Sequence, residues 1–260
     1  MGGVDLFMKL SSRLLQIAER LPKGCRLADI GSDHALLPVY TVQSGIALSA
    51  VAGEVNDGPL KAAQRQVDQA GLSSLISVRK GDGLAVVNPG EVNTVTIAGM
   101  GGALIASILE AGKDKLNSVN TLVLQPNVGE DLVRRWLLRH EWALTDEVIL
   151  EEDGKIYEIL TARRLPDAAQ INAKLYAPRT IPGSRVELNE ELLLLLGPLL
   201  VREPEAVWFD KWHSEIVQLE KIRLSVSSST QEASRVKAQE LAELQNQLKE
   251  VMACLQRDKP

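Results

Sequence analysis

The stretch Leu27-Ala-Asp-Ile-Gly-Ser-Asp-His34 decides the fold class of this chain. An apolar run ends in Asp29, and Gly31 follows at the point where a turn should open. Nucleotide-binding strands of parallel α/β domains end in this way. The second glycine of the usual G-x-G turn is replaced by Asp33, which stands beside His34. We therefore expect one turn to combine a cofactor-binding glycine with two groups able to act on a substrate.

Strand and helix patterns alternate on both sides of this turn, as in parallel α/β domains. Five runs rich in β-branched residues lack strict alternation, which is typical of strands that are covered on both faces. These expected strands are residues 26–30, 47–53, 76–79, 94–98 and 121–125. The expected helices are an amphipathic N-terminal helix over 5–20, a helix that begins near Asp57, and helices over 102–110 and 130–140.

The pattern changes after residue 140. Two strand-like runs, 144–150 and 156–162, flank Glu151-Glu-Asp-Gly154. An Asp-Gly pair between such runs predicts a β-hairpin. Five parallel strands and a closing antiparallel pair give a seven-stranded sheet, which narrows the α/β options considerably.

The C-terminal part of the chain has a helical pattern. A connection rich in Pro, Asn, Gly and Ser covers 165–187, and apolar residues then step by three and four over 209–226 and 241–255. A short polar run, Ser227-Ser-Ser-Thr230, separates the two segments. We therefore expect an antiparallel helical coiled coil. The expected domains are an α/β domain over 1–165, and the connection with the coiled-coil domain over 166–260.

Length and composition limit the classes of function. The chain has 260 residues, 45% of them hydrophobic, a net charge of -5 and a pI near 5.4. This content allows a full core, and the acidic balance excludes a wholly basic nucleic-acid-binding protein but not a local basic face. Two distant cysteines and three scattered histidines fit no metal-ligand spacing, so we expect no metal. Because neither a signal-peptide pattern nor a membrane-length apolar run is present, we expect a cytoplasmic protein.

Candidate ligand groups follow four successive strands. In an open parallel sheet, ligands bind beyond the carboxyl ends of the strands. A glycine there lets the backbone approach a ligand, and an acid after the second strand can accept both ribose hydroxyls. An acid between glycines after the third strand can accept a hydrogen bond from an adenine amino group. The expected cofactor-binding residues are Asp29, Gly31, Ser32, Glu54, Val55, Gly81, Asp82, Gly83, Ala98, Gly99 and Met100.

The residues favour S-adenosylmethionine over NAD as the cofactor. A dinucleotide places its pyrophosphate against the turn and the helix N-terminus, where the carboxylate of Asp33 would repel it. A sulfonium is cationic and carries no phosphate, so a nearby carboxylate is tolerated. Taken singly, the signals have plain structural alternatives, since Asp29 can simply organise the turn and Gly-Asp-Gly is often a turn itself. Their order at four successive strand ends indicates a ligand site, and the closing antiparallel hairpin, like Asp33, favours methyl transfer over hydride transfer.

Seven motifs are specific when taken together: Asp29-Ile-Gly-Ser-Asp-His34, Gly53-Glu54, Asp57-Gly-Pro59, Gly81-Asp-Gly83, Ile97-Ala-Gly-Met-Gly-Gly102, Leu124-Gln-Pro-Asn127 and Glu151-Glu-Asp-Gly154. Together they resemble the TrmK family, bacterial tRNA (adenine-22-N1)-methyltransferases. The resemblance runs from Leu10-Ser-x-Arg-Leu14 through the C-terminal coil. It implies a class I (Rossmann-like) methyltransferase domain with a C-terminal helical coiled-coil domain. It also implies S-adenosylmethionine as methyl donor and adenine 22 of tRNA as acceptor.

The segment after the fourth strand suits a ring nitrogen as the acceptor. Adenine methyltransferases that act on the amino group typically carry Asp/Asn-Pro-Pro-Tyr/Phe there, whereas this chain has Ala98-Gly-Met-Gly-Gly102. N1 has a free lone pair at neutral pH and becomes cationic on methylation, so a nearby carboxylate stabilises the developing charge. Asp33 is the first catalytic candidate. His34 is the second, and it can equally be a structural hydrogen-bond donor.

A tRNA substrate requires local basic residues despite the acidic total. The candidate substrate-binding residues are Lys9, Arg13, Arg20, Lys80 and Asn127, although the cations can also belong to a solvated helix face. Two other functions stay open: methyl transfer to another RNA site or a non-RNA acceptor, and a non-catalytic S-adenosylmethionine-binding scaffold whose coiled coil binds a partner. We expect a monomer.

Overall fold

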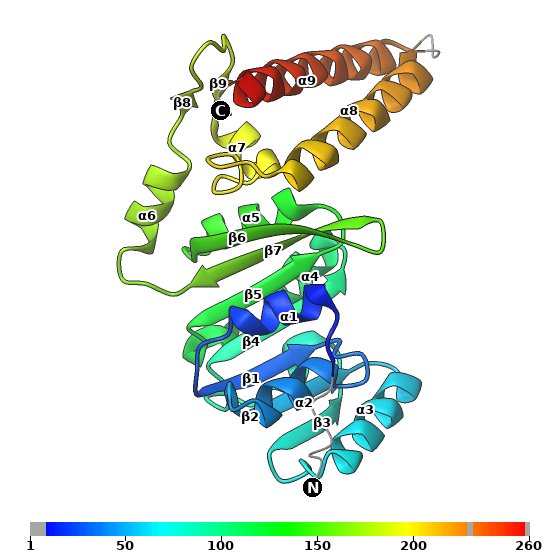
Figure 1. Ribbon diagram of the computed structural model, residues 1–260, viewed down its shortest axis with the longest axis vertical. Coiled ribbons are helices and arrows are strands. Elements are labelled where there is room, and N and C mark those ends of the chain that lie inside the picture. Colours follow the sequence, from blue (N-terminus) through cyan, green and yellow to red (C-terminus); the bar gives the residue numbers. More distant parts are fainter. Residues whose placement is uncertain (1–8, 228–230, 258–260) are drawn as a thin grey trace, which may run out of the picture. The chain divides into compact units, whose positions relative to one another are not determined.

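A computed structural model describes residues 9–227 and 231–257 (Figure 1). The chain divides into two compact units between Ala173 and Lys174. This division lies a few residues after the boundary expected at residue 165, which stays a prediction.

The first unit is built on one seven-stranded sheet with the order β3-β2-β1-β4-β5-β7-β6. Strands β1 to β5 pair in parallel, and β7 runs antiparallel to both β5 and β6. The expected sheet of five parallel strands and a closing hairpin is therefore confirmed. The strands are β1 (Cys25–Ile30), β2 (Ala47–Glu54), β3 (Ile76–Lys80), β4 (Thr94–Met100), β5 (Thr121–Pro126), β6 (Ala143–Glu152) and β7 (Lys155–Arg163).

Helices cover both faces of this sheet. Residues of α1, α2 and α3 share one buried cluster with alternate residues of the strands, such as Leu27, Ala50 and Val123. The residues between them, such as Ile97 and Leu124, face the other layer, where α4 and α5 pack together. The helical elements of this unit are α1 (Ser12–Glu19), α2 (Leu36–Gln43), α3 (Asp57–Gln69), η1 (Gly83–Val86), α4 (Gly102–Ala111), η2 (Lys113–Ser118) and α5 (Glu130–Arg139).

The N-terminal helix is shorter than its apolar pattern predicts. Of the expected span 5–20, residues 5–8 lie outside the described residues, and Lys9 to Ser11 are not helical. Helix α1 begins at Ser12 because Ser11 caps it: the Ser11 hydroxyl accepts a hydrogen bond from the N–H of Leu14. Apolar spacing describes the buried face of a helix but does not locate its first residue, and the predicted start was therefore wrong.

The segment expected as a plain connection contains short elements of its own. Helix α6 (Ala168–Leu175) is followed by the two-stranded antiparallel sheet of β8 (Arg179–Thr180) and β9 (Glu187–Leu188). Elements of this length, in a segment with frequent Pro and Gly residues, are too short to show a strand or helix period in the sequence. Helix α7 (Glu190–Leu196) then begins directly after the capping residue Asn189.

The second unit ends in two long antiparallel helices, α8 (Ala206–Ser227) and α9 (Glu232–Arg257), as expected (Figure 1). Trp208 is fully buried near the start of α8, and its indole N–H donates to the carbonyl of Leu196 at 3.0 Å. Farther along, Ile216 of α8 and Leu248 of α9 are both buried, and Gln245 Nε2 donates to the Ile216 carbonyl at 3.2 Å. These contacts make the paired helices part of the core of this unit.

Candidate active site

Three strand ends meet at the switch point of the sheet. The order of strands places β1 between β2 and β4. The chain adds β2 and β3 on one side of β1, and then adds β4 and β5 on its other side. Ligands of open α/β sheets bind at such a point, beyond the carboxyl ends of the strands. Those ends are Ile30, Glu54 and Met100. The turn that follows Ile30 therefore lies where a ligand site is expected.

The carboxylate of Asp29 is buried within the turn. Asp29 is 4% exposed, Ser32 Oγ donates to its Oδ2 at 2.6 Å, and Thr96 Oγ1 donates to its Oδ1 at 2.5 Å. Burial raises the pKa of Asp29, and the two hydroxyl donors oppose that rise. Sequence reasoning missed Thr96, although the strand register pairs it with Asp29. These bonds fix the turn, and a direct contact of Asp29 or Ser32 with a cofactor stays a prediction.

Glu54 joins the ends of β1 and β2. Its side chain is buried, and Oε1 accepts a hydrogen bond from the N–H of Asp33 at 2.6 Å. Within the described part of the chain Oε2 makes no protein hydrogen bond, so it can accept one from a ribose hydroxyl. Burial is the main cause that raises the pKa of Glu54; the Asp33 N–H opposes the rise, and the charges of Asp29 and Asp33 add to it. The next residue, Val55, is half exposed beside this carboxylate.

Asp33, His34 and Ala35 form a left-handed turn, with φ angles of 37°, 66° and 54°. Such angles are uncommon outside glycine and cost conformational energy, so the surrounding contacts must hold the turn. The hydrogen bond to Glu54 is one of them. The side chains of Asp33 and His34 are 84% and 57% exposed, and His34 Nε2 lies 3.5 Å from Asp33 Oδ1. Both predicted catalytic groups therefore reach solvent together.

Gly31 occupies a position where a side chain would not fit. Its φ is +71°, and its N–H donates to the Gly53 carbonyl at 2.9 Å. A Cβ atom on Gly31 would lie 2.2 Å from Met100 Cε. The thioether arm of Met100 therefore lies against Gly31. This contact brings together Gly31 and Met100, two predicted cofactor-binding residues at the ends of the neighbouring strands β1 and β4.

The loop after β3 is attached to the same edge. The N–H of Gly81 donates to the carbonyl of Glu54 at 2.9 Å. Gly83 is buried, and a Cβ atom there would lie 2.9 Å from Ile108 Cγ2. Asp82, between the two glycines, is exposed. Its carboxylate is thus accessible one strand beyond Glu54, and its contact with adenine stays a prediction.

Side-chain amides tie the end of β4 to the end of β5. Gln125 is fully buried, and its Oε1 accepts from the N–H of Gly99 at 3.1 Å. The exposed Asn127 donates from Nδ2 to the Gly99 carbonyl at 2.8 Å. Ala98 is half-buried just before this segment. Sequence reasoning did not assign Gln125 to the site, although it belongs to the Leu124-Gln-Pro-Asn127 motif and is a polar residue at the end of an otherwise apolar strand.

The predicted tRNA-binding cations differ in their surroundings. Lys9 is exposed in the segment before α1. Arg20 forms an ion pair with Asp146, in which Arg20 Nε lies 2.8 Å from Asp146 Oδ2. Lys80 Nζ lies 2.6 Å from Asp57 Oδ1, but both side chains are largely exposed, so this pair is weak and open to a competing phosphate. Binding of tRNA by these residues stays a prediction.

Arg13 reaches inward rather than outward from α1. Its Nη1 donates to the buried Oε1 of Gln125 at 2.6 Å, and its guanidinium lies 5.3 Å from the centre of the Tyr157 ring. Its backbone N–H donates to Glu152 Oε1 at 3.2 Å. Arg13 is therefore built into the end of the sheet, which is a different setting from the solvated basic face that its sequence position suggested.

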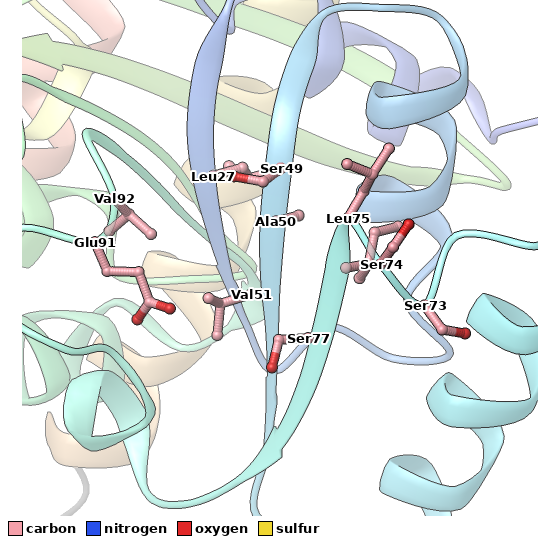
Figure 2. Close-up of a pocket in the computed structure, with 11 residues that line it drawn as sticks. Leu27, Ser49, Ala50, Val51, Ser73, Ser74, Leu75, Ser77, Glu91 and Val92 are labelled. Atoms are coloured by element: carbon pink, nitrogen blue, oxygen red, sulfur yellow. The ribbon is translucent and has the colours of Figure 1, made fainter.

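A separate cavity of about 140 Å³ lies toward the amino ends of β1, β2 and β3 (Figure 2). Leu27, Ser49 and Ser77 line it from the strands, with Glu91 and Ser73 on its two sides. Pockets for ligands of cofactor size usually hold about 300–1,000 Å³. This cavity is smaller, and it does not include the strand-end groups described above.

Among the side chains that the structure describes, no three of the His, Cys, Asp and Glu residues are grouped as metal ligands. None of the helices in residues 9–227 and 231–257 is long and apolar enough to cross a membrane.

Comparisons with known proteins agree on one family. Its model, TrmK: tRNA (adenine(22)-N(1))-methyltransferase, matches residues 27–253. The Bacillus subtilis tRNA (adenine(22)-N(1))-methyltransferase is 47% identical over 94% of this chain and 98% of its own length, and the crystal structure of B. subtilis TrmK has a TM-score of 0.82 at 46% identity, covering 94% of this chain and 99% of its own. Streptococcus pneumoniae Sp1610, solved in complex with S-adenosyl-L-methionine, has a TM-score of 0.77 at 37% identity over 94% of this chain and 100% of its own. The chain belongs to the TrmK family of tRNA (adenine(22)-N(1))-methyltransferases.

Proposed function

We propose that this chain transfers the methyl group of S-adenosylmethionine to N1 of adenine 22 in tRNA and so forms 1-methyladenosine. The observation that carries this proposal is the similarity to the B. subtilis enzyme along 94% of the chain. The exposed Asp33 on a turn held by Glu54 supports it, because the carboxylate stands beside the predicted cofactor groups. The complex of S. pneumoniae Sp1610 supports the choice of cofactor.

The residues at the strand ends fit S-adenosylmethionine. Gly31 lets the backbone approach the ligand, Glu54 Oε2 accepts from the ribose, and the exposed Asp82 accepts from the adenine amino group. Val55 offers an apolar surface beside the proposed ribose position, and the Met100 thioether lies against Gly31 where a side chain would otherwise be. When it is bound, this cofactor supplies an electrophilic methyl group on a sulfonium.

The acceptor nitrogen needs alignment more than activation. N1 of adenine carries a lone pair in the ring plane and no proton at neutral pH, so the chain has to extrude the base and align N1 with the methyl carbon. The N1–carbon bond forms as the carbon–sulfur bond breaks, and the positive charge passes to the adenine ring. The Asp33 carboxylate stabilises that charge by accepting a hydrogen bond from N6.

A polyanionic tRNA is bound by Lys9 and Lys80 through its phosphates. We place this monomeric enzyme in the cytoplasm, where its substrate is.

Methylation at a defined position tests the proposal. The protein is incubated with labelled S-adenosylmethionine and either a tRNA transcript with adenine 22 or the same transcript with uracil there, and the RNA is digested to nucleosides. We expect labelled 1-methyladenosine from the first transcript alone. Label in a different nucleoside or in a protein would support another acceptor. Binding of S-adenosylmethionine without any transfer would support a scaffold.

The raised pKa of Glu54 predicts how cofactor binding depends on pH. Because burial raises this pKa above the ordinary value of 4.5, the carboxylate takes up its proton at a higher pH than an exposed glutamate does. Affinity for S-adenosylmethionine should therefore weaken as the pH falls through this raised pKa. Calorimetric titrations between pH 5 and 8 would measure it. At pH 8, Glu54→Gln should bind about 10- to 100-fold more weakly, since a charged hydrogen bond is lost.

The same Glu54→Gln variant is the control for that pH dependence. It retains Asp29 and the ionisable groups of the ligand, so any remaining pH dependence comes from them. We expect a flatter curve than for the wild type. Parallel curves for the two proteins would show that Glu54 is not the titrating group.

A further inference from the structure

Every polar atom of the Gln125 side chain is used. Oε1 accepts from Arg13 Nη1 at 2.6 Å and from the Gly99 N–H at 3.1 Å. Nε2 donates to the Pro126 carbonyl at 2.8 Å and to Asn127 Oδ1 at 3.1 Å. The side chain is fully buried, so water does not replace these partners. A buried amide that is satisfied in this way has one stable orientation.

Arg13 sets the direction of the whole network. A guanidinium can only donate, so the oxygen of Gln125, and not its nitrogen, has to face Arg13. The Gln125 nitrogen then faces Asn127, which must turn its own oxygen toward Gln125 and its nitrogen toward the Gly99 carbonyl, at 2.8 Å. If either amide flipped, two donors or two acceptors would meet. The orientation of the exposed Asn127 is thus decided by a residue on α1.

The network is joined to the segment that borders the predicted cofactor turn. Its last partner, Gly99, precedes Met100, and Met100 lies against Gly31 at the cofactor turn. The N–H of Asn127 also donates to the Met100 carbonyl at 2.7 Å. The Asn127 amide is therefore attached to the backbone segment that carries Met100, next to the predicted cofactor site.

We propose that Arg13, acting through Gln125, orients Asn127 so that its Oδ1 accepts a hydrogen bond from the N6 amino group of the target adenine. This inference rests on the proposed function. One lone pair of Oδ1 is used by Gln125, and the second remains for the base. N6 has two hydrogens, so this bond leaves one for Asp33, and N1 stays free for the methyl group. Asn127 is then a specificity residue, and Arg13 is a positioning residue.

A tRNA with purine riboside at position 22 tests the acceptor, because purine keeps N1 but lacks the N6 amino group. The ratio of kcat/KM for adenosine and purine tRNA is measured for the wild type, Asn127→Ala and Arg13→Met. We expect the wild-type ratio to exceed those of both variants about tenfold, the effect of one hydrogen bond of about 1.4 kcal/mol. The different reactivity of N1 in purine affects every enzyme equally, so it cancels when the ratios of the wild type and a variant are compared. A change in stability alone lowers kcat/KM for both tRNAs equally and leaves the ratio unchanged.

The double variant Arg13→Met/Asn127→Ala tests whether Arg13 acts through Asn127. We expect its kcat/KM for adenosine tRNA to equal that of Asn127→Ala, since the first substitution has nothing left to orient. Multiplied effects would overturn the relay. Gln125→Glu keeps the acceptor for Arg13 but cannot donate to Asn127 when ionised, and it should lower the adenosine/purine ratio as Arg13→Met does.

Controls separate this inference from the proposed function. Arg65→Met removes an exposed arginine of α3 and should keep the wild-type ratio. If Arg13→Met fails to fold, Asn127→Ala still tests the acceptor, because its side chain is exposed. Equal ratios in the wild type and Asn127→Ala would reject the inference while leaving the methyltransferase intact. If the wild type forms no 1-methyladenosine, the proposed function itself is rejected.

Discussion

Replacing Asp33 by asparagine is expected to slow methyl transfer about 10²- to 10³-fold, while S-adenosylmethionine binds with nearly wild-type affinity. The loss is that of one group that stabilises charge in the transition state. Asparagine tolerates the left-handed backbone of this turn, where φ is 37°, so the substitution removes charge and leaves the fold of the turn. Single-turnover methylation of tRNA and calorimetric titration of the cofactor measure the two quantities separately.

His34→Asn is the matched comparison for Asp33→Asn, because it lies at the next left-handed position of the same turn. We expect a much smaller effect on the rate, since the proposed mechanism gives His34 no contact with the base, and its Nε2 lies 3.5 Å from Asp33 Oδ1. A near-normal rate for Asp33→Asn would remove Asp33 from the mechanism. An equal loss in both variants would show that the two side chains act as one unit.

Replacing Arg134 by methionine is expected to lower the free energy of unfolding by about 3–5 kcal/mol, the usual result when one partner of a buried ion pair is removed. Arg134 of α5 is fully buried between Glu147 of β6 and Glu158 of β7. Its Nε lies 2.6 Å from Glu147 Oε1, and its Nη2 forms a short contact with Glu158 Oε2. Without the guanidinium, the buried carboxylates of Glu147 and Glu158 lose the positive charge that both ion pairs share.

Urea denaturation followed by circular dichroism measures this loss. The control is the triple variant Arg134→Met/Glu147→Leu/Glu158→Leu, which removes the carboxylates together with the cation. We expect it to recover much of the stability, because an apolar trio of similar volume has no buried charge to compensate. A single variant as stable as the wild type would mean that the trio contributes no net stability.

The alternation of strands and helices was predictable from the sequence because it depends on local periods. The hairpin β6–β7 was predictable from Asp153-Gly154, and the two long C-terminal helices from apolar steps of three and four. The ends of these elements were harder to locate. The start of α1 depends on the single capping hydroxyl of Ser11, which an apolar pattern does not contain.

The strand-end residues of the candidate site were predictable because parallel strands bring their carboxyl ends to one edge. Their partners were not. The contact of Thr96 with Asp29 joins residues 67 positions apart, and that of Arg13 with Gln125 joins residues 112 apart. Such pairs exist only once the register of the strands is known. Arg13 illustrates this well: on the sequence it belongs to a basic helix face, and in the structure it completes a buried network.

The hydrogen bond from the Asp33 N–H to Glu54 has a consequence for the evolution of the chain. It makes the conformation of the turn after β1 depend on the acid at the end of β2, although 21 residues separate Asp33 from Glu54. Replacing Glu54 would release the turn as well as the ribose contact, so drift at one motif is constrained by the other. Among relatives, we therefore expect the two motifs to be kept or lost together.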